Sequence, residues 1–199
     1  IKRNHLLRED RLNGIRTYPV KTCLNISPFI AYIAGNSVAI LKEFGSLVTR
    51  TKPHVVHHHN ISLLGYDILK KQSNYLNIYT AHDYWLICQR NSLLQNEGRE
   101  CRGGSCICCA MRHGRPPQLW RYRVAFRNAL RDIDILIAPS NYMRKRILQR
   151  GKIESVTMSN FVPNPPAKLG HSGMSSFFLY SGILEAHKGI VDLVKLYHR

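Results

Sequence analysis

Acidic residues are scarce in this chain of 199 residues. Only 12 Asp and Glu stand against 29 Lys and Arg, which gives a formal net charge of +17. The charge is uneven, because the stretch from Arg112 to Arg150 holds ten Lys and Arg but only two Asp and Glu. This balance favours an anionic partner, such as nucleic acid, a lipid surface or a phosphorylated ligand, and the charge alone does not choose among them.

Also missing is an apolar run long enough to cross a membrane. The longest, residues 28–41, is interrupted by Asn36 and Ser37 and falls short of the roughly 20 residues that a span needs. It predicts a buried helix. No signal peptide and no internal repeat are visible, no methionine precedes Ile1, and the C-terminal helix pattern has no cap. We therefore expect a piece of a longer protein.

Apolar residues make up 44% of the chain, enough for a folded core, and their spacing alternates between strand and helix periods. Strands are predicted at 14–20, 54–60, 77–82, 134–140, 155–160 and 177–182. Helices are predicted at 29–50, 60–72, 117–131, 141–150 and 187–199. Ser140 is the expected N-cap of the fourth helix, and Gly151 its left-handed stop. This order predicts an α/β fold with a parallel sheet covered on both faces.

Ligands of open parallel sheets bind beyond the carboxyl ends of the strands. The side chains that we expect in a ligand pocket there are those of His82 and, around it, His59, Asp83, Tyr84, Trp85 and Ser140. In the strand at 54–60, alternation puts His57 and His59 on one face and His58 on the other. A histidine beside an acid and two aromatic residues suits a sugar or nucleotide pocket. Simpler interpretations stay open: an exposed strand end at 54–60, and a His82 held by nearby backbone.

Five of the six cysteines lie between Cys88 and Cys109. The spacing C-x12-C-x4-C-x2-C of Cys88, Cys101, Cys106 and Cys109 is typical of a structural zinc site. Reduced thiols and a disulfide are the alternatives. Any metal here would be structural rather than catalytic.

Arginines recur at four-residue spacing in the predicted helix at 117–131. Arg123, Arg127 and Arg131 would share one face of that helix, beside Trp120 and Val124. Such a face is either solvated or in contact with anionic lipid.

Four segments taken together resemble the retaining glycosyltransferases of family 4. They are KPHVVHHHN, YTAHDYWLICQRNSLLQNEGRECRGGSC, DILIAPSNYMRKRIL and FLYSGILEAHKGI, which together span about residues 50–199. The resemblance implies the GT-B architecture, in which two Rossmann-like domains face each other across a cleft. Residues 1–160 would form most of the acceptor-side domain, without its first strand, 161–175 the linker, and 176–199 the first βα unit of the donor-side domain.

The resemblance also implies roles for individual residues. His82 matches the histidine that contacts the transferred sugar, and Lys188, with Gly182 before it, matches the donor diphosphate clamp. Ile183 stands where the family usually has an arginine, and Ser159 replaces the usual proline before Asn160 at the hinge. The family's paired glutamates would lie beyond the last residue, so this chain alone is expected to be inactive.

The leading hypothesis is therefore a glycosyltransferase that moves a sugar from a nucleotide-sugar to a glycan or lipid-linked acceptor, with retention. It would need no catalytic metal and would carry at most one structural zinc. We expect it in the cytoplasm, where it can associate with the inner face of the membrane, and we expect no nucleic acid partner. The alternatives are a nucleic-acid-binding protein with a cysteine cluster and an inactive glycosyltransferase remnant.

Overall fold

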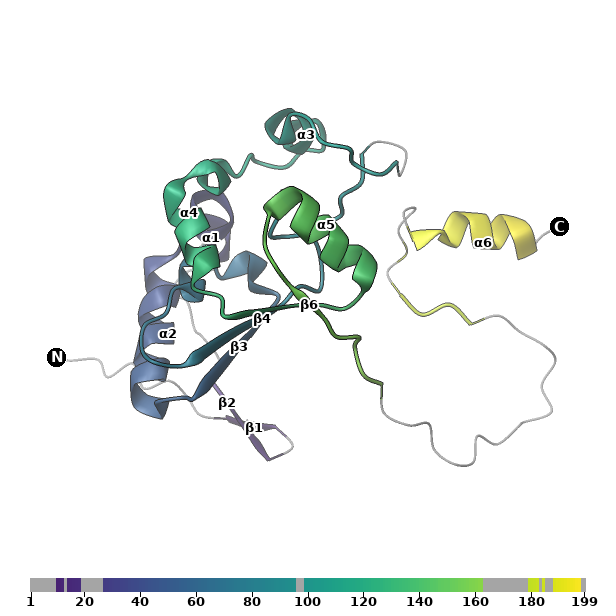
Figure 1. Cartoon of the computed structure of the whole chain (residues 1–199). Helices are drawn as coiled ribbons and strands as arrows, with labels where there is room; N and C mark the ends of the chain where they lie inside the picture. The colour runs from purple at the N-terminus through teal and green to yellow at the C-terminus, as the bar shows by residue number, and fades with distance from the viewer. Residues whose placement is uncertain are drawn as a thin grey trace, which may run out of the picture. The chain divides into compact units, whose positions relative to one another are not determined.

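The computed structural model describes residues 10–12, 14–18, 27–95, 99–162, 179–182, 184 and 188–197 (Figure 1). The chain divides into two compact units. The first comprises Ile1–Leu93 with Gly103–Ser159, and the second comprises Leu94–Arg102 with Asn160–Arg199. The first unit contains all the strands of the described chain and most of its helices.

A four-stranded parallel sheet organises the first unit. Its strands follow each other in chain order: β3 (Val55–His59), β4 (Leu76–Thr80), β5 (Ile135–Ala138) and β6 (Val156–Thr157). Parallel neighbours need crossover connections, and helical segments supply them here. The predicted α/β class, with a Rossmann-like parallel sheet, is confirmed, and so are the strands expected at 54–60, 77–82, 134–140 and 155–160, though each is shorter.

The first predicted strand does not join this sheet. Within the predicted range 14–20, strand β2 occupies Ile15–Thr17 and pairs antiparallel with β1 (Asp10–Leu12), which the sequence analysis missed. Residues 19 and 20 lie outside the described chain. The hairpin turns at Gly14, whose φ of +82° is readily adopted by glycine.

The helix predicted at 29–50 is two helices, α1 (Ser27–Ala34) and α2 (Val38–Thr51). Gly35 separates them with a φ of +81°, a conformation that cannot continue a right-handed helix. The burial expected of residues 28–41 holds on one side only, because Ala31 and Ile40 lie in the core whereas Phe29 is 59% exposed and Val38 is 83% exposed. Among the described helices, none is long and apolar enough to cross a membrane.

The helix predicted at 60–72 is replaced by two short 3-10 turns, η1 (Ile61–Leu63) and η2 (Tyr66–Leu69). Gly65 lies between them with a φ of +92°, and a Cβ there would come within 2.8 Å of the Gly35 carbonyl oxygen. The Tyr66 amide donates to that same carbonyl at 2.7 Å. The close approach of two backbone segments therefore overrides the helical pattern.

The predicted basic helix at 117–131 begins later than expected. A 3-10 turn, η4 (Leu119–Tyr122), leads into α4 (Val124–Arg131). Arg123 precedes the helix in an extended conformation, with φ −77° and ψ 146°, so it does not share a helical face with Arg127 and Arg131. The sequence analysis also missed α3 (Cys106–Arg112), which Ser105 caps by accepting from the Cys108 amide.

Helix α5 (Asn141–Gly151) has the predicted N-cap, because the Ser140 hydroxyl accepts a hydrogen bond from the Met143 amide. The predicted left-handed stop at Gly151 was wrong. Lys152 adopts that conformation, with φ 53°. Gly151 serves close packing instead, since a Cβ there would lie 2.9 Å from a methyl group of Ile87.

The second unit is described only in parts. Helix α6 (Ile190–Tyr197) confirms the core of the helix predicted at 187–199. Of the strand predicted at 177–182, residues 179–182 are described and are not in a strand. Residues 163–175 of the predicted linker lie outside the described chain, so the start of a donor-side domain stays a prediction.

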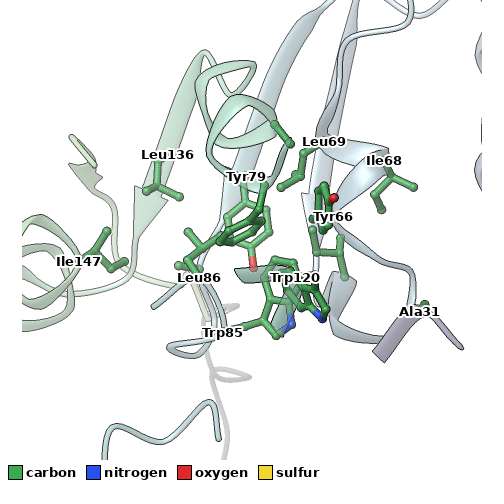
Figure 2. Packing of buried hydrophobic residues seen from close by; sticks show 14 of the residues in the cluster. Ala31, Tyr66, Ile68, Leu69, Tyr79, Trp85, Leu86, Trp120, Leu136 and Ile147 are labelled. Atoms are coloured by element: carbon green, nitrogen blue, oxygen red, sulfur yellow. The ribbon is translucent and has the colours of Figure 1, made fainter. Parts of the chain in front are cut away.

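An aromatic cluster holds the first unit together (Figure 2). The Trp120 ring lies 5.3 Å from the Tyr66 ring, 5.0 Å from the Phe126 ring and 5.7 Å from the Trp85 ring, and each of these residues is nearly inaccessible to solvent. Aromatic pairs at such separations add stability beyond the area that they bury. The indole NH of Trp120 donates to the Tyr32 carbonyl at 3.0 Å, which anchors α1 to this cluster.

The core lies against one face of the sheet. Tyr79, Leu136 and Ala138 point into it, and the register of the strands places their side chains on the same face. On the other face, Val55 is 49% exposed and Leu76 is 40% exposed. On that same face Thr80 is 6% exposed and Ile137 is 8% exposed. Within the described residues, the cover on both faces that the sequence predicted is therefore found only in part.

Gly35→Ala should destabilise the fold by more than the backbone strain of an alanine at a positive φ. A Cβ at residue 35 would come within 2.5 Å of the Trp120 ring, and overpacking of a core typically costs about 1–3 kcal/mol. Gly14→Ala is the matched control, because Gly14 has nearly the same φ and nothing within 4 Å of a Cβ. Urea unfolding of both variants measures the difference. Equal losses in the two would contradict the packing role of Gly35.

Candidate functional site

Two strand ends meet at the carboxyl edge of the sheet. The parallel register pairs His59, the last residue of β3, with Thr80, the last residue of β4. His82 follows two residues later. Adjacent parallel strands lie less than 5 Å apart, so side chains on these ends can touch.

Three histidines and a threonine form a hydrogen-bonded cluster at this edge. His59 Nδ1 lies 2.7 Å from His82 Nε2, and His57 Nε2 lies 2.7 Å from the Thr80 hydroxyl oxygen. The His59 and His82 rings are stacked with centroids 5.0 Å apart, and those of His57 and His59 are 4.1 Å apart. We call these four residues the histidine cluster. Two features of the sequence indicate this cluster: the alternation in HVVHHH and the end of a strand at Thr80. Thr80 itself was not predicted as a site residue.

The contact between His59 and His82 constrains their protonation. A hydrogen bond between two ring nitrogens needs a proton on one and a lone pair on the other, so the two rings cannot both be fully protonated while it persists. Partial burial lowers the pKa of His59, and the charges of His57 and His82 lower it further. The lowered pKa favours the neutral form of His59, whose exposed imidazole can then both donate and accept hydrogen bonds.

His58 points to the opposite side of β3, as the alternation predicted, and is 5% exposed. Its ring packs 5.9 Å from Phe44 of α2, and among the described residues its Nε2 finds no hydrogen-bond partner. Burial lowers the pKa of His58 to about 4, although the nearby Asn77 side chain acts in the other direction. His58 is thus a neutral core residue.

The other residues expected at this edge have different surroundings. Trp85 is 2% exposed and lies within the aromatic cluster of Figure 2, so its ring does not face a ligand. Asp83 accepts from the Trp85 amide at 2.8 Å, which shapes the turn after β4. Tyr84 is partly buried against the core, and Ser140 caps α5. Of the expected pocket residues, the structure brings His59 into contact with His82.

The expected donor-side residues belong to the second unit. Lys188 is exposed two residues before α6, and Gly182 is exposed in a loop. That unit is described by itself, so the diphosphate role of Lys188 stays a prediction.

None of the five clustered cysteines forms a disulfide, and all of them are described. Cys106 and Cys109 lie one turn apart on α3, whereas Cys101 belongs to the second unit. Among the described residues, no three His, Cys, Asp or Glu side chains are grouped to hold a metal. The zinc site stays a prediction from the spacing alone.

A parallel α/β sheet with polar side chains at its carboxyl edge is typical of the Rossmann-like class of ligand-binding domains. The model of Glycosyltransferase Family 4 matches residues 8–163 of the chain. The chain therefore belongs to glycosyltransferase family 4, which confirms the family that the four sequence segments indicated. Comparisons with curated proteins and with solved structures found no match.

His58→Leu should remove part of the acid sensitivity of the fold. In the native state the pKa of His58 is about 4, below the ordinary value of 6.5, so the unfolded chain takes up a proton first as the pH falls. Between pH 6.5 and 4 this uptake should cost the native state up to about 1.4 kcal/mol per pH unit, and none above that window.

Urea unfolding at pH 7.5, 5.5 and 4.5 measures this loss. His58→Leu should be less sensitive to pH than the wild type, whereas His54→Gln, at the exposed start of β3, should behave as the wild type does. Parallel pH profiles for wild type and His58→Leu would contradict the buried, neutral His58.

The cysteine spacing predicts about one zinc per chain. Metal analysis of protein purified without added metal should find it, and Cys106→Ser with Cys109→Ser should lose both the zinc and thermal stability. Cys108→Ser is the matched control on the same helix. Metal-free wild type with an unchanged melting temperature would rule the zinc out.

Proposed function

We propose that this chain supplies the acceptor-side wall of a retaining glycosyltransferase, which moves a sugar from a nucleotide-sugar to a glycan or lipid-linked acceptor. The observation that carries the proposal is the contact of His59 with His82 at the carboxyl edge of the sheet, where ligands of this fold class bind. A nucleic-acid-binding protein with a cysteine cluster would leave both this edge and the family match unexplained.

In this proposal His82 contacts the transferred sugar. Its exposed imidazole can hydrogen-bond a sugar hydroxyl near the bond that breaks, and the contact with His59 limits the ring orientations that it can adopt. A group held in one orientation contributes more to catalysis than a mobile one, because little reorganisation is left for the reacting state.

The leaving diphosphate needs positive charge. Lys188 would provide it from the second unit as a point charge, without a catalytic metal. Ile183 cannot make the phosphate contact of the arginine that the family usually carries there, so we expect other basic groups to share the task.

A lipid-linked acceptor would also explain some of the excess positive charge. Arg127 and Arg131 are exposed on α4, and Arg123 is exposed just before it. Exposed arginines attract the anionic lipids of the inner face of the membrane at a range of about 8 Å in physiological salt.

His82→Ala should lower the turnover of sugar transfer by the protein. We expect kcat to fall by about 100- to 1,000-fold, the range for loss of one positioned hydrogen-bonding group, and donor affinity to change much less. His54→Ala, at the amino end of β3, is the matched control and should be as active as the wild type.

Transfer kinetics with nucleotide-sugars, together with donor titration calorimetry, test this proposal. Undiminished turnover in His82→Ala would remove His82 from the site. A complete wild-type protein that transfers no sugar from any common donor would instead indicate an inactive remnant.

A further inference from the structure

One face of helix α1 is apolar and open to solvent. Its large side chains Phe29, Ile30 and Ile33 are exposed, and their spacing of i, i+1 and i+4 places them on a single stripe of the helix. Ala31, on the opposite side of α1, lies in the core. The helix carries no charged residue. Contiguous exposed apolar patches on folded proteins commonly mark a surface that binds another partner.

The elements next to α1 extend this apolar surface. α1 packs against η4, where the Trp120 indole NH donates to the Tyr32 carbonyl at 3.0 Å. η4 packs in turn against α4 (Figure 1). Leu119 and Tyr122 of η4 and Val124 of α4 are also exposed. Large apolar side chains therefore reach solvent from all three adjoining elements.

The exposed face of α4 adds positive charge. Val124, Arg127 and Arg131 recur at i, i+3 and i+7, so they share one side of the helix, and all three are exposed. Phe126, on the other side of α4, is buried in the core. No Asp or Glu occurs between residues 101 and 131, so this part of the sequence is basic without any acid of its own.

The combination of apolar and basic side chains discriminates between possible partners. A second copy of the chain also has a net charge of +17, and a symmetric contact would bring like surfaces together. Nucleic acid would attract the arginines through its phosphates, but this attraction makes no use of the apolar stripe of α1. A bilayer with anionic lipids suits both, because its headgroups attract arginine and its acyl chains accept apolar side chains.

We propose that α1 and the exposed face of α4 form a docking surface for an anionic lipid bilayer. α1 lies along the bilayer, with Phe29, Ile30 and Ile33 inserted about 5–10 Å into the boundary between headgroups and acyl chains. Arg127 and Arg131 contact the lipid phosphates. With 8 residues, α1 is far shorter than the roughly 20 residues of a membrane span, so it inserts at the surface only.

This docking surface is independent of the proposed sugar transfer, because neither the histidine cluster nor Lys188 belongs to it. It also differs from a purely electrostatic attraction. Salt screens the contact of exposed arginines with a charged surface, whereas burial of apolar side chains is not screened. Part of the binding should therefore persist at high salt, and that part should depend on α1.

Co-sedimentation of the wild-type protein with vesicles tests the proposal. We expect saturable binding to vesicles of mixed phosphatidylglycerol and phosphatidylcholine, and much weaker binding to phosphatidylcholine alone. Phe29→Gln and Ile33→Gln should each lower the partition coefficient about three- to tenfold, the effect of removing one half-exposed apolar side chain from the contact. Leu148→Gln is the matched control. Leu148 is 39% exposed, like Ile33 at 40%, but it lies on α5, which packs on β5 and β6.

A second pair of variants tests the contribution of charge. Arg127→Gln combined with Arg131→Gln should lower the partition coefficient about 25-fold, at about fivefold for each arginine near an anionic surface. Arg144→Gln combined with Lys145→Gln removes the same charge from exposed positions of α5 and should have a smaller effect. All of these side chains are exposed, so the variants should fold.

Three results would overturn the proposal. The first is an equal partition coefficient for the wild type, Ile33→Gln and Leu148→Gln. The second is self-association of the protein, measured by sedimentation equilibrium, that Phe29→Gln abolishes. The third is binding of single-stranded RNA that depends on Ile33 and Arg127 while vesicle binding does not.

Discussion

Parallel pairing of β3 with β4 is the constraint on which the candidate site depends. The register that joins His57 to Ile78 and His59 to Thr80 brings the ends of both strands to the same edge. A slip of one residue would turn His57 and His59 toward the core and His58 toward the edge. The burial of His58 beside Phe44 opposes such a slip, because an exposed imidazole would then have to replace the buried one.

The aromatic cluster has a second effect beyond stability. Trp85 and Trp120 pack against the sheet and at the same time hold the guanidinium of Arg121. Aromatic faces partly compensate a buried cation, and they leave its hydrogen-bonding edge available. The core that orders the carboxyl edge of the sheet thereby also holds a positive charge among its aromatic rings.

Sequence patterns predicted the parallel sheet, the alternation at His57 to His59 and the cap at Ser140, because each depends on local periodicity or local hydrogen bonding. They failed where distant segments meet. Gly35 and Gly65 break the predicted helices since their backbones approach each other, and no local pattern reports that contact. Trp85 was expected at the site but belongs to the core, because aromatic residues suit both places. The contact of Arg121 with the Trp85 ring was missed because it joins segments far apart in the chain.

Nitrogen-15 NMR of the histidine side chains tests most directly whether the carboxyl edge is where the sugar binds. Addition of a nucleotide-sugar and acceptor to the protein should shift the imidazole signals of His82 and His59 together, because a hydrogen bond joins the two rings. The signals of His54 and the buried His58 should stay unchanged. Saturation with donor and acceptor that leaves the His82 and His59 signals unmoved would contradict the account.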